Sequence, residues 1–187
     1  MPGTLQVGGN TVLTHTGDAG AGTNTINSAV VFPAGHIIQI AHNSKGDENS
    51  DSSTSVSHEI VHDSSNNNEW FVTISNITSG NKILLMFTFC TQQYGPSVDS
   101  AFGGYGICRD SLSNMIVSST GGNSDGVNTQ AGAAGVTAHN TITLSAFDTP
   151  TASSHSYYLT YRATNSNYST KVRPDIPAQF FAFEVQQ

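Results

Sequence analysis

Apolar and polar residues alternate along most of the chain, and the apolar stretches are rich in β-branched and aromatic side chains. Alternation of period two is typical of β-strands with one buried face, whereas amphipathic helices repeat every 3.6 residues. Between turn-forming residues the pattern predicts about nine strands, at residues 35–43, 55–62, 69–78, 82–91, 101–110, 112–118, 137–148, 156–164 and 176–185. Almost no helix is predicted.

The order and character of these strands indicate their arrangement. Residues 82–91 form the most apolar segment and are predicted to be a central strand. No helical segment stands between strands to make a parallel crossover, so the pattern favours an all-β fold, an antiparallel β-sandwich of jelly-roll type. An immunoglobulin-like sandwich is the alternative, but Trp70 lacks cysteines at the spacing of that fold's disulfide.

Residues 1–34 differ from the rest of the chain. They hold six of the 18 glycines, several Thr and Asn residues, and one short alternating piece at residues 5–13. Because so little apolar surface cannot form a core alone, we expect an extended N-terminal arm that needs a partner surface. The predicted domains are an anchoring arm at residues 1–34 and a sandwich domain at residues 35–187.

The composition is polar with few charges. There are 24 Ser, 21 Thr and 16 Asn among 187 residues, while 13 Asp and Glu outnumber 6 Lys and Arg and give a net charge of −7. Binding to nucleic acid or to an anionic membrane requires clustered positive charge, so neither partner is expected. No apolar run approaches the roughly 20 residues of a spanning helix, and the first residues lack the pattern of a secretion signal.

Residues 58–62, His-Glu-Ile-Val-His, match the H-E-x-x-H pattern of zinc metalloproteases. That motif works on a helix, where residues four apart share one face and both imidazoles reach one metal. Here the flanks are rich in Ser and Asn, and β-branched residues lie within the motif, which favours a strand. On a strand His58 and His62 would lie roughly 13 Å apart, with Glu59 on the opposite face. We therefore expect no metal site.

A second metal pattern is incomplete. Asp47, Asn49 and Asp51 match the first oxygen ligands of an EF-hand loop, which binds calcium. The match then breaks, because Ser52 and His58 stand where that loop needs Gly and a bidentate Glu. A solvated acidic loop is favoured.

Cys90 and Cys108 lie at similar depths in two predicted strands that could pair across residues 92–102. A disulfide requires close Cα atoms and an oxidising compartment, so two buried thiols are favoured. Neither cysteine has the local signature of a nucleophile, and the chain has no glycine-rich phosphate loop ahead of a helix. The sequence predicts no catalytic residue, no cofactor and no enzymatic activity.

An ordered series of segments resembles the small jelly-roll virion proteins of tailed phages of marine and freshwater bacteria, which are carried on capsids or fibres. The series is GHIIQIAHN after Phe-Pro-Ala, SNITSGNKILLMFTF, FGGYGICRDS, ITLSAFDTPTASSHSYYLTYRATNSN and the terminal FFAFEVQ, and it covers residues 32–187. Its landmarks are structural: an Arg-bearing strand, an Asp-x-Pro turn at residues 148–150, and a last strand with Glu184. The Asn-rich residues 64–68 and the HEIVH strand depart from it.

The resemblance implies a homotrimer of jelly rolls about a threefold axis, located in the virion and assembled in the host cytoplasm. The last strand, with Phe180, Phe181 and Phe183, carries more apolar surface than one core face needs, in agreement with burial between copies. We expect a capsid decoration (cement) protein that binds the major capsid protein or other virion proteins through residues 1–34. The short chain favours head decoration over a fibre tip.

The alternative is a tail-fibre or receptor-binding tip module that recognises a host-surface glycan or protein. The loops predicted at residues 92–102 and 119–135 are rich in Tyr, Ser, Gly and Asn, which suit adaptable polar recognition. Composition alone does not separate a binding loop from a solvated one. The binding residues are therefore unknown from the sequence.

Overall fold

The computed structural model describes residues 3–7, 10–16, 23–26, 34–46, 51–63, 67–94, 101–118, 127–131, 137–151, 153–163, 166, 169–173 and 177–187. The chain divides into two compact units, Met1–His36 and Ile37–Gln187. All regular elements in these ranges are strands, and no helix among them is long and apolar enough to cross a membrane. Each unit is described by itself.

The first unit contains a three-stranded antiparallel sheet. Its strands are β1 (Gly3–Val7), β2 (Asn10–Thr16) and β3 (Thr23–Ile26), in the order β1-β2-β3. Leu5 is 57% exposed, and none of the described residues of this unit belongs to the hydrophobic core cluster. The expected extended arm therefore folds back on itself as a meander, but no core of its own is seen in its described part.

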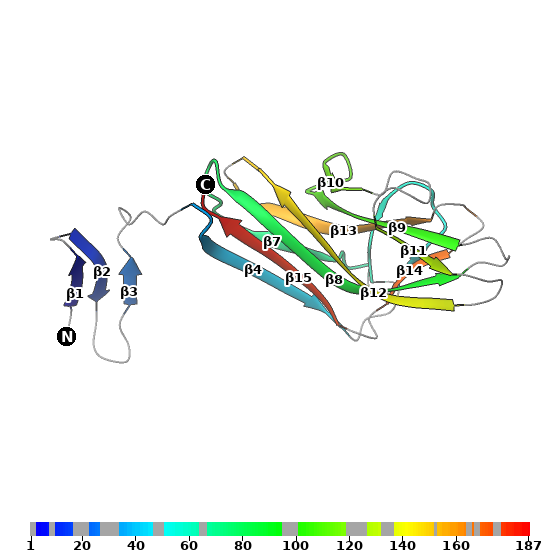
Figure 1. Ribbon diagram of the computed structural model, residues 1–187, viewed down its shortest axis with the longest axis horizontal. Coiled ribbons are helices and arrows are strands. Elements are labelled where there is room, and N and C mark those ends of the chain that lie inside the picture. Colours follow the sequence, from blue (N-terminus) through cyan, green and yellow to red (C-terminus); the bar gives the residue numbers. More distant parts are fainter. Residues whose placement is uncertain are drawn as a thin grey trace. The chain divides into compact units, whose positions relative to one another are not determined.

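The second unit contains two antiparallel sheets (Figure 1). We name the first the β8 sheet; its strands are β4 (Ile37–Lys45), β5 (Asp51–Ser53), β8 (Lys82–Tyr94), β12 (Thr137–Asp148), β14 (Ser169–Arg173) and β15 (Ala178–Val185). β12 pairs with β8 along one edge, while β15 and then β14 pair along the other. β4 lies beyond β15, and β5 lies beyond β14. The prediction of a central strand at residues 82–91 is confirmed.

The second sheet is named the β9 sheet. Its strands are β6 (Glu59–Ile60), β7 (Phe71–Ile74), β9 (Ala101–Arg109), β10 (Met115–Val117), β11 (Val127–Ala131) and β13 (His155–Ala163). β9 pairs with β13 along one edge and with β11 and β10 along the other. β6 and β7 pair with the far edge of β13. All these pairs are antiparallel.

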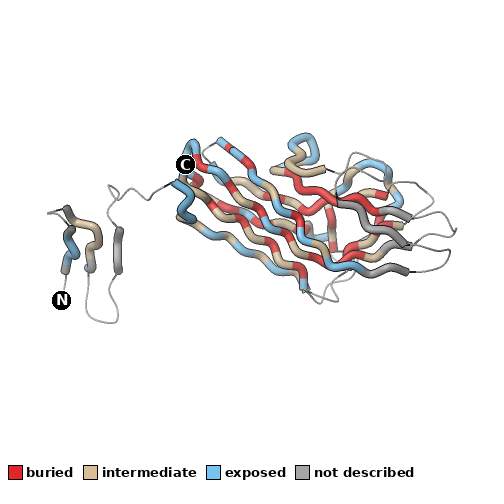
Figure 2. The backbone as a smooth tube through the Cα atoms, in the orientation of Figure 1, coloured by how far each residue is buried: buried red, intermediate tan, exposed pale blue. Residues whose placement is uncertain are grey.

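The two sheets pack face to face around one hydrophobic core. Buried and more exposed residues alternate along β8 and β15, as expected for strands with one covered face (Figure 2). Aromatic pairs join the sheets: the ring centroids of Phe89 and Tyr105 lie 5.3 Å apart, and those of Trp70 and Phe180 lie 6.2 Å apart. The prediction of an all-β antiparallel fold is confirmed, and the arrangement is that of a β-sandwich.

Several strands differ from the prediction in length. The expected strands at residues 55–62 and 112–118 shorten to β6 and β10, and the expected loop at residues 119–135 contains β11. β5 and β14 were not predicted; they pair with each other, and β14 also pairs with β8. The reason is that short polar strands such as β5 (Asp-Ser-Ser) carry no hydrophobic alternation and depend on distant partners.

The expected pairing of the two cysteine-bearing strands is wrong. Cys90 lies on β8 and Cys108 on β9, and these strands belong to different sheets. Both thiols are buried and neither forms a disulfide. β8 and β9, which follow each other along the chain, therefore do not form a hairpin.

Candidate functional site

The β8 sheet has an apolar face on the side away from the core, here called the outer face. Its described outward residues alternate with buried ones and come from four neighbouring strands: Ile40, His42 and Ser44 on β4; Gln179, Phe181, Phe183 and Val185 on β15; Lys82, Leu84, Met86 and Thr88 on β8; Thr141, Thr143, Ser145 and Phe147 on β12. A sheet face with water on it is normally polar, so this composition calls for an explanation.

Large apolar side chains on the outer face are strongly exposed. Phe147 is 61% exposed, Ile40 59% and Met86 39%. Because each comes from a different strand of the same sheet, these side chains form a patch and are not isolated surface residues. Contiguous exposed apolar patches on monomers mark interaction surfaces.

A stacked row of rings lies across β4 and β15 within this face. The rings of His42 and Phe181 have centroids 4.4 Å apart, and those of Phe181 and Phe183 lie 5.7 Å apart with an interplanar angle of 14°. His42 Nε2 and Gln179 Oε1 are 2.7 Å apart, which fixes the orientation of the imidazole. The row is thus ordered before any partner binds, so less side-chain entropy is lost on binding.

The described residues of the outer face carry few charges, and all of these charges are positive. Lys82 is the one Lys, Arg, Asp or Glu among the outward residues named above, and Lys171 and Arg173 on β14 face the same side, opposite Gln92 and Cys90 of β8, in a chain with a net charge of −7. Polar positions pair with one another, as in the 2.8 Å hydrogen bond between the hydroxyl groups of Thr88 and Thr143. Two copies of an acidic chain repel each other least where their surfaces carry no acidic groups.

A charged network ties the two sheets together at one end of the sandwich. Arg109 on β9 donates from Nη1 to both carboxylate oxygens of Asp148 on β12, at 3.0 and 2.8 Å. The Tyr157 hydroxyl on β13 donates to Asp148 Oδ2 at 2.8 Å. Burial, together with this hydrogen bond, raises the pKa of Tyr157 far above its usual range. Asp148 is 9% exposed and its oxygens accept bonds within the network, so the network is structural.

Asp110 and His155 form a second pair, which stabilises the turn after β12. Asp110 adopts φ 60°; its Oδ1 accepts from the Ser156 backbone amide, and its Oδ2 lies 2.7 Å from His155 Nδ1. Burial by itself would raise the pKa of Asp110, but the hydrogen bonds from Ser156 and His155 lower it below its usual value. His155 Nε2 lies 3.2 Å from the Thr151 carbonyl, so both ring nitrogens hold the turn in place.

The residues of the HEIVH segment have separate contacts. His58 Nδ1 lies 3.1 Å from Thr160 Oγ1, Glu59 accepts a hydrogen bond from Ser53, and His62 Nε2 lies 3.8 Å from Glu69 Oε1. The segment is extended, with β6 at its centre, as the sequence predicted. Among the described residues, no group of three or more His, Cys, Asp or Glu side chains is placed to hold a metal ion.

The remaining predicted sites fall partly outside the described residues. Asp47 and Asn49 lie outside them, and Asp51 is the first residue of β5. Most of the candidate recognition loops, residues 95–100, 119–126 and 132–136, also lie outside, so receptor binding through these loops stays a prediction.

The Cys108 thiol is unsuited to nucleophilic chemistry at neutral pH. Burial is the main cause that raises its pKa to about 11, and the nearby Asp110 carboxylate adds to the shift. The thiolate is the reactive form of cysteine, so a raised pKa lowers reactivity. Cys108 therefore acts as a small buried side chain of the β9 sheet.

The chain matches no protein-family model, and no curated protein matches it. The outer face is the feature of the described residues that most favours an interaction, because its large exposed apolar side chains come from neighbouring strands of one sheet.

Proposed function

We propose that this chain is a non-enzymatic structural protein of the virion of a tailed phage, a capsid decoration protein that assembles as a homotrimer of jelly rolls. The observation that carries the proposal is the patch of large apolar side chains on the outer face of the β8 sheet, with Phe147, Ile40 and Met86 exposed. Burying such a face against copies of itself removes apolar surface from water, which is the dominant driving force for association.

Support for the jelly-roll topology comes from the path of the chain. β8 and β12 belong to one sheet, while the strands that follow each of them, β9 and β13, belong to the other. Repeated crossing between two antiparallel sheets is the general pattern of jelly rolls and related Greek-key sandwiches. The sequence resemblance to virion jelly rolls points the same way.

In this proposal residues 1–34 attach the trimer to the major capsid protein or to another virion protein. The first unit suits attachment because it is a separate compact unit and none of its described residues belongs to the hydrophobic core cluster. A trimer has three such attachments and binds multivalently. When one attachment is released, the other two keep it near its site at a high effective concentration, so it rebinds. This linkage between attachment points would stabilise the capsid, which is the role of a cement protein.

Sedimentation velocity tests the trimer. We expect the full chain to sediment as a trimer and the variants Phe147→Asp and Ile40→Asp to sediment as folded monomers, because each places a charge in the proposed interface. Val56→Asp is the matched control, since Val56 is 51% exposed but lies outside the outer face. A wild-type chain that stays monomeric, or an Ile40→Asp variant that stays trimeric, contradicts the proposed interface.

Immunogold electron microscopy on intact particles tests the location. Label spread over the head supports the decoration role, and deletion of residues 1–34 should then give a folded trimer that no longer binds particles. Label confined to the tail favours the receptor-binding alternative instead. Particles without label contradict the virion proposal.

A further inference from the structure

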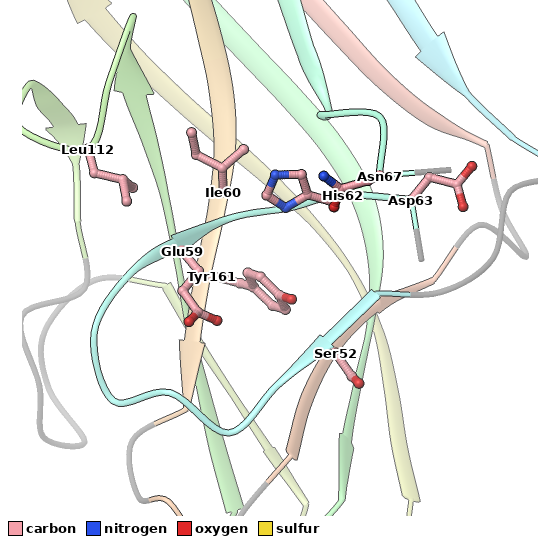
Figure 3. A pocket seen from close by; sticks show the side chains of 8 residues that line it. All are labelled: Ser52, Glu59, Ile60, His62, Asp63, Asn67, Leu112 and Tyr161. Atoms are coloured by element: carbon pink, nitrogen blue, oxygen red, sulfur yellow. The ribbon is translucent and has the colours of Figure 1, made fainter. Parts of the chain in front are cut away.

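A second feature, unrelated to the outer face, is a pocket of about 490 Å³ beside β6 (Figure 3). Its walls come from segments far apart in the sequence: β5, β6, the turn after β6, β13 and the turn between β9 and β10. The volume lies within the range of roughly 300–1,000 Å³ that is usual for small-molecule sites. The proposed structural role makes no use of it.

Glu59 and Tyr161 both line this pocket. They are directly opposite each other in the antiparallel pairing of β6 and β13, so both side chains lie on the same side of the sheet. The Ser53 hydroxyl donates to Glu59 Oε2 and orients the carboxylate. Tyr161 is 3% exposed and its position is fixed by the core. A carboxylate acceptor is thus held beside an aromatic ring.

The wall that carries His62 and Asn67 is preformed. The Asp63 amide donates to the Asn68 carbonyl at 2.8 Å, and the Asn67 amide donates to the Asp63 carbonyl at 2.8 Å. Asn67 adopts the left-handed conformation, with φ 59°, which Asn tolerates better than most residues. Because these backbone bonds hold Asp63, Asn67 and Asn68 without a ligand, little ordering of these residues is needed on binding.

The lining selects a chemical class of ligand. The eight lining residues include no Lys or Arg, so phosphates and carboxylates would find no counter-charge. The lining residues offer hydrogen-bond donors and acceptors, among them the side-chain amide of Asn67 and the carboxylate of Glu59. Ile60 and Leu112 add apolar surface. A cationic amine would bind the Glu59 carboxylate but would leave the hydrogen-bond donors of the pocket unused. A neutral sugar uses the donors, the acceptors and the apolar surface, because its hydroxyls donate and accept hydrogen bonds while its C–H groups are apolar.

The geometry points to a binding site for a neutral saccharide in the pocket between Glu59, Asn67, Leu112 and Tyr161. The site lies away from the outer face, whose residues are not among the pocket's lining. Saccharide binding would add a recognition role to the structural one, and it does not depend on trimer formation.

Saturation-transfer NMR on the full chain tests this site with four probes: glucose, galactose, mannose and N-acetylglucosamine. We expect transfer to at least one of them, and affinity about tenfold or more weaker in Glu59→Gln, because a hydrogen bond to a charged group is lost. Leu112→Ala should also weaken sugar binding, because it removes part of the apolar wall of the pocket. The hydrophobic core is unaffected, since Leu112 is 41% exposed.

Val56→Ala is the matched control, because Val56 is similarly exposed but does not line the pocket. It should bind as the wild type does, and thermal melting should show all variants folded. The proposal is overturned if no probe shows transfer, if transfer is unchanged in both Glu59→Gln and Leu112→Ala, or if ethanolamine displaces the sugar at equal concentration. These outcomes are independent of sedimentation, so failure here leaves the trimer proposal intact.

Discussion

Both faces of the β8 sheet carry large apolar side chains, but the described residues of the second unit cover only one of these faces. On β15, Phe180 points inward and is fully buried, while Phe181 and Phe183, its near neighbours, point outward and are half-buried. On β8, Leu85 is fully buried and Met86 is 39% exposed. A strand that is apolar on both sides is typical of a position between two layers, and the described residues of the second unit supply one of these layers.

The largest expected effect comes from the covered face. Phe180→Ala should lower the free energy of unfolding by about 3–5 kcal/mol, because it leaves a cavity between Phe87 and Trp70. Phe183→Ala should cost only about 1 kcal/mol, since its ring is already partly in water. Both variants are measured by urea unfolding in the Phe147→Asp background, so that self-association does not contribute to the measured stability. Equal losses of unfolding free energy in the two variants would show that the two faces do not differ.

The next largest effect concerns the network of Arg109, Asp148 and Tyr157, which joins the two sheets. Asp148→Ala should cost roughly 3 kcal/mol, because it leaves the partly buried Arg109 without its partner and removes the acceptor of Tyr157. Thr149→Ala, at the exposed neighbouring residue, is the control and should change stability by less than about 0.5 kcal/mol. Thermal unfolding measures both. A small effect of Asp148→Ala would mean that core packing alone joins the sheets.

The outer side of the β9 sheet offers a contrast with that of the β8 sheet. A Cβ atom on Gly106 would lie 2.4 Å from the Val117 carbonyl oxygen and 2.9 Å from Thr160 Oγ1. Gly106→Ala should therefore cost about 1–3 kcal/mol through overpacking. Ser145→Val on the open outer face also enlarges a side chain by one non-hydrogen atom and should cost less than about 0.5 kcal/mol. If Gly106→Ala proves neutral in urea unfolding, β10 does not pack closely on β9.

The smallest effect is a dependence of stability on acid pH. The pKa of Asp110 is lowered from its ordinary value of 3.8, so the folded state favours the carboxylate. Its contribution is complete above 3.8 and is lost as the pH falls through the lowered, folded-state pKa. Asp110→Asn should flatten the acid limb of a plot of stability against pH while leaving the curve near pH 7 parallel to that of the wild type. An unchanged acid limb would contradict the role of this carboxylate.

Much of the second unit could be predicted from its alternation pattern. The long strands β4, β8, β12, β13 and β15 lie close to the predicted ranges, because each has enough apolar residues at period two to identify it. β5 and β14 could not be predicted, since their short or polar sequences form strands only by pairing with β14 and β8 respectively. The meander of the first unit was likewise missed.

The candidate sites were predicted less completely. The aromatic excess of β15 was visible in the sequence, but Ile40, Met86 and Phe147 join it only because β4, β8 and β12 are aligned beside it. The HEIVH segment was correctly expected to be extended. Its place opposite Tyr161, and hence the pocket, could not be foreseen, because Glu59 and Tyr161 are brought together by the pairing of β6 with β13.

The sequence by itself determined that this chain is built from antiparallel strands, because alternation along a strand is a local property. The tertiary structure alone decided which apolar face is covered, which strands meet, and that Arg109 and Asp148 bond across a separation of 39 residues. These are consequences of sheet register and of packing between layers. Both depend on contacts between distant segments, and no local pattern of residues encodes them.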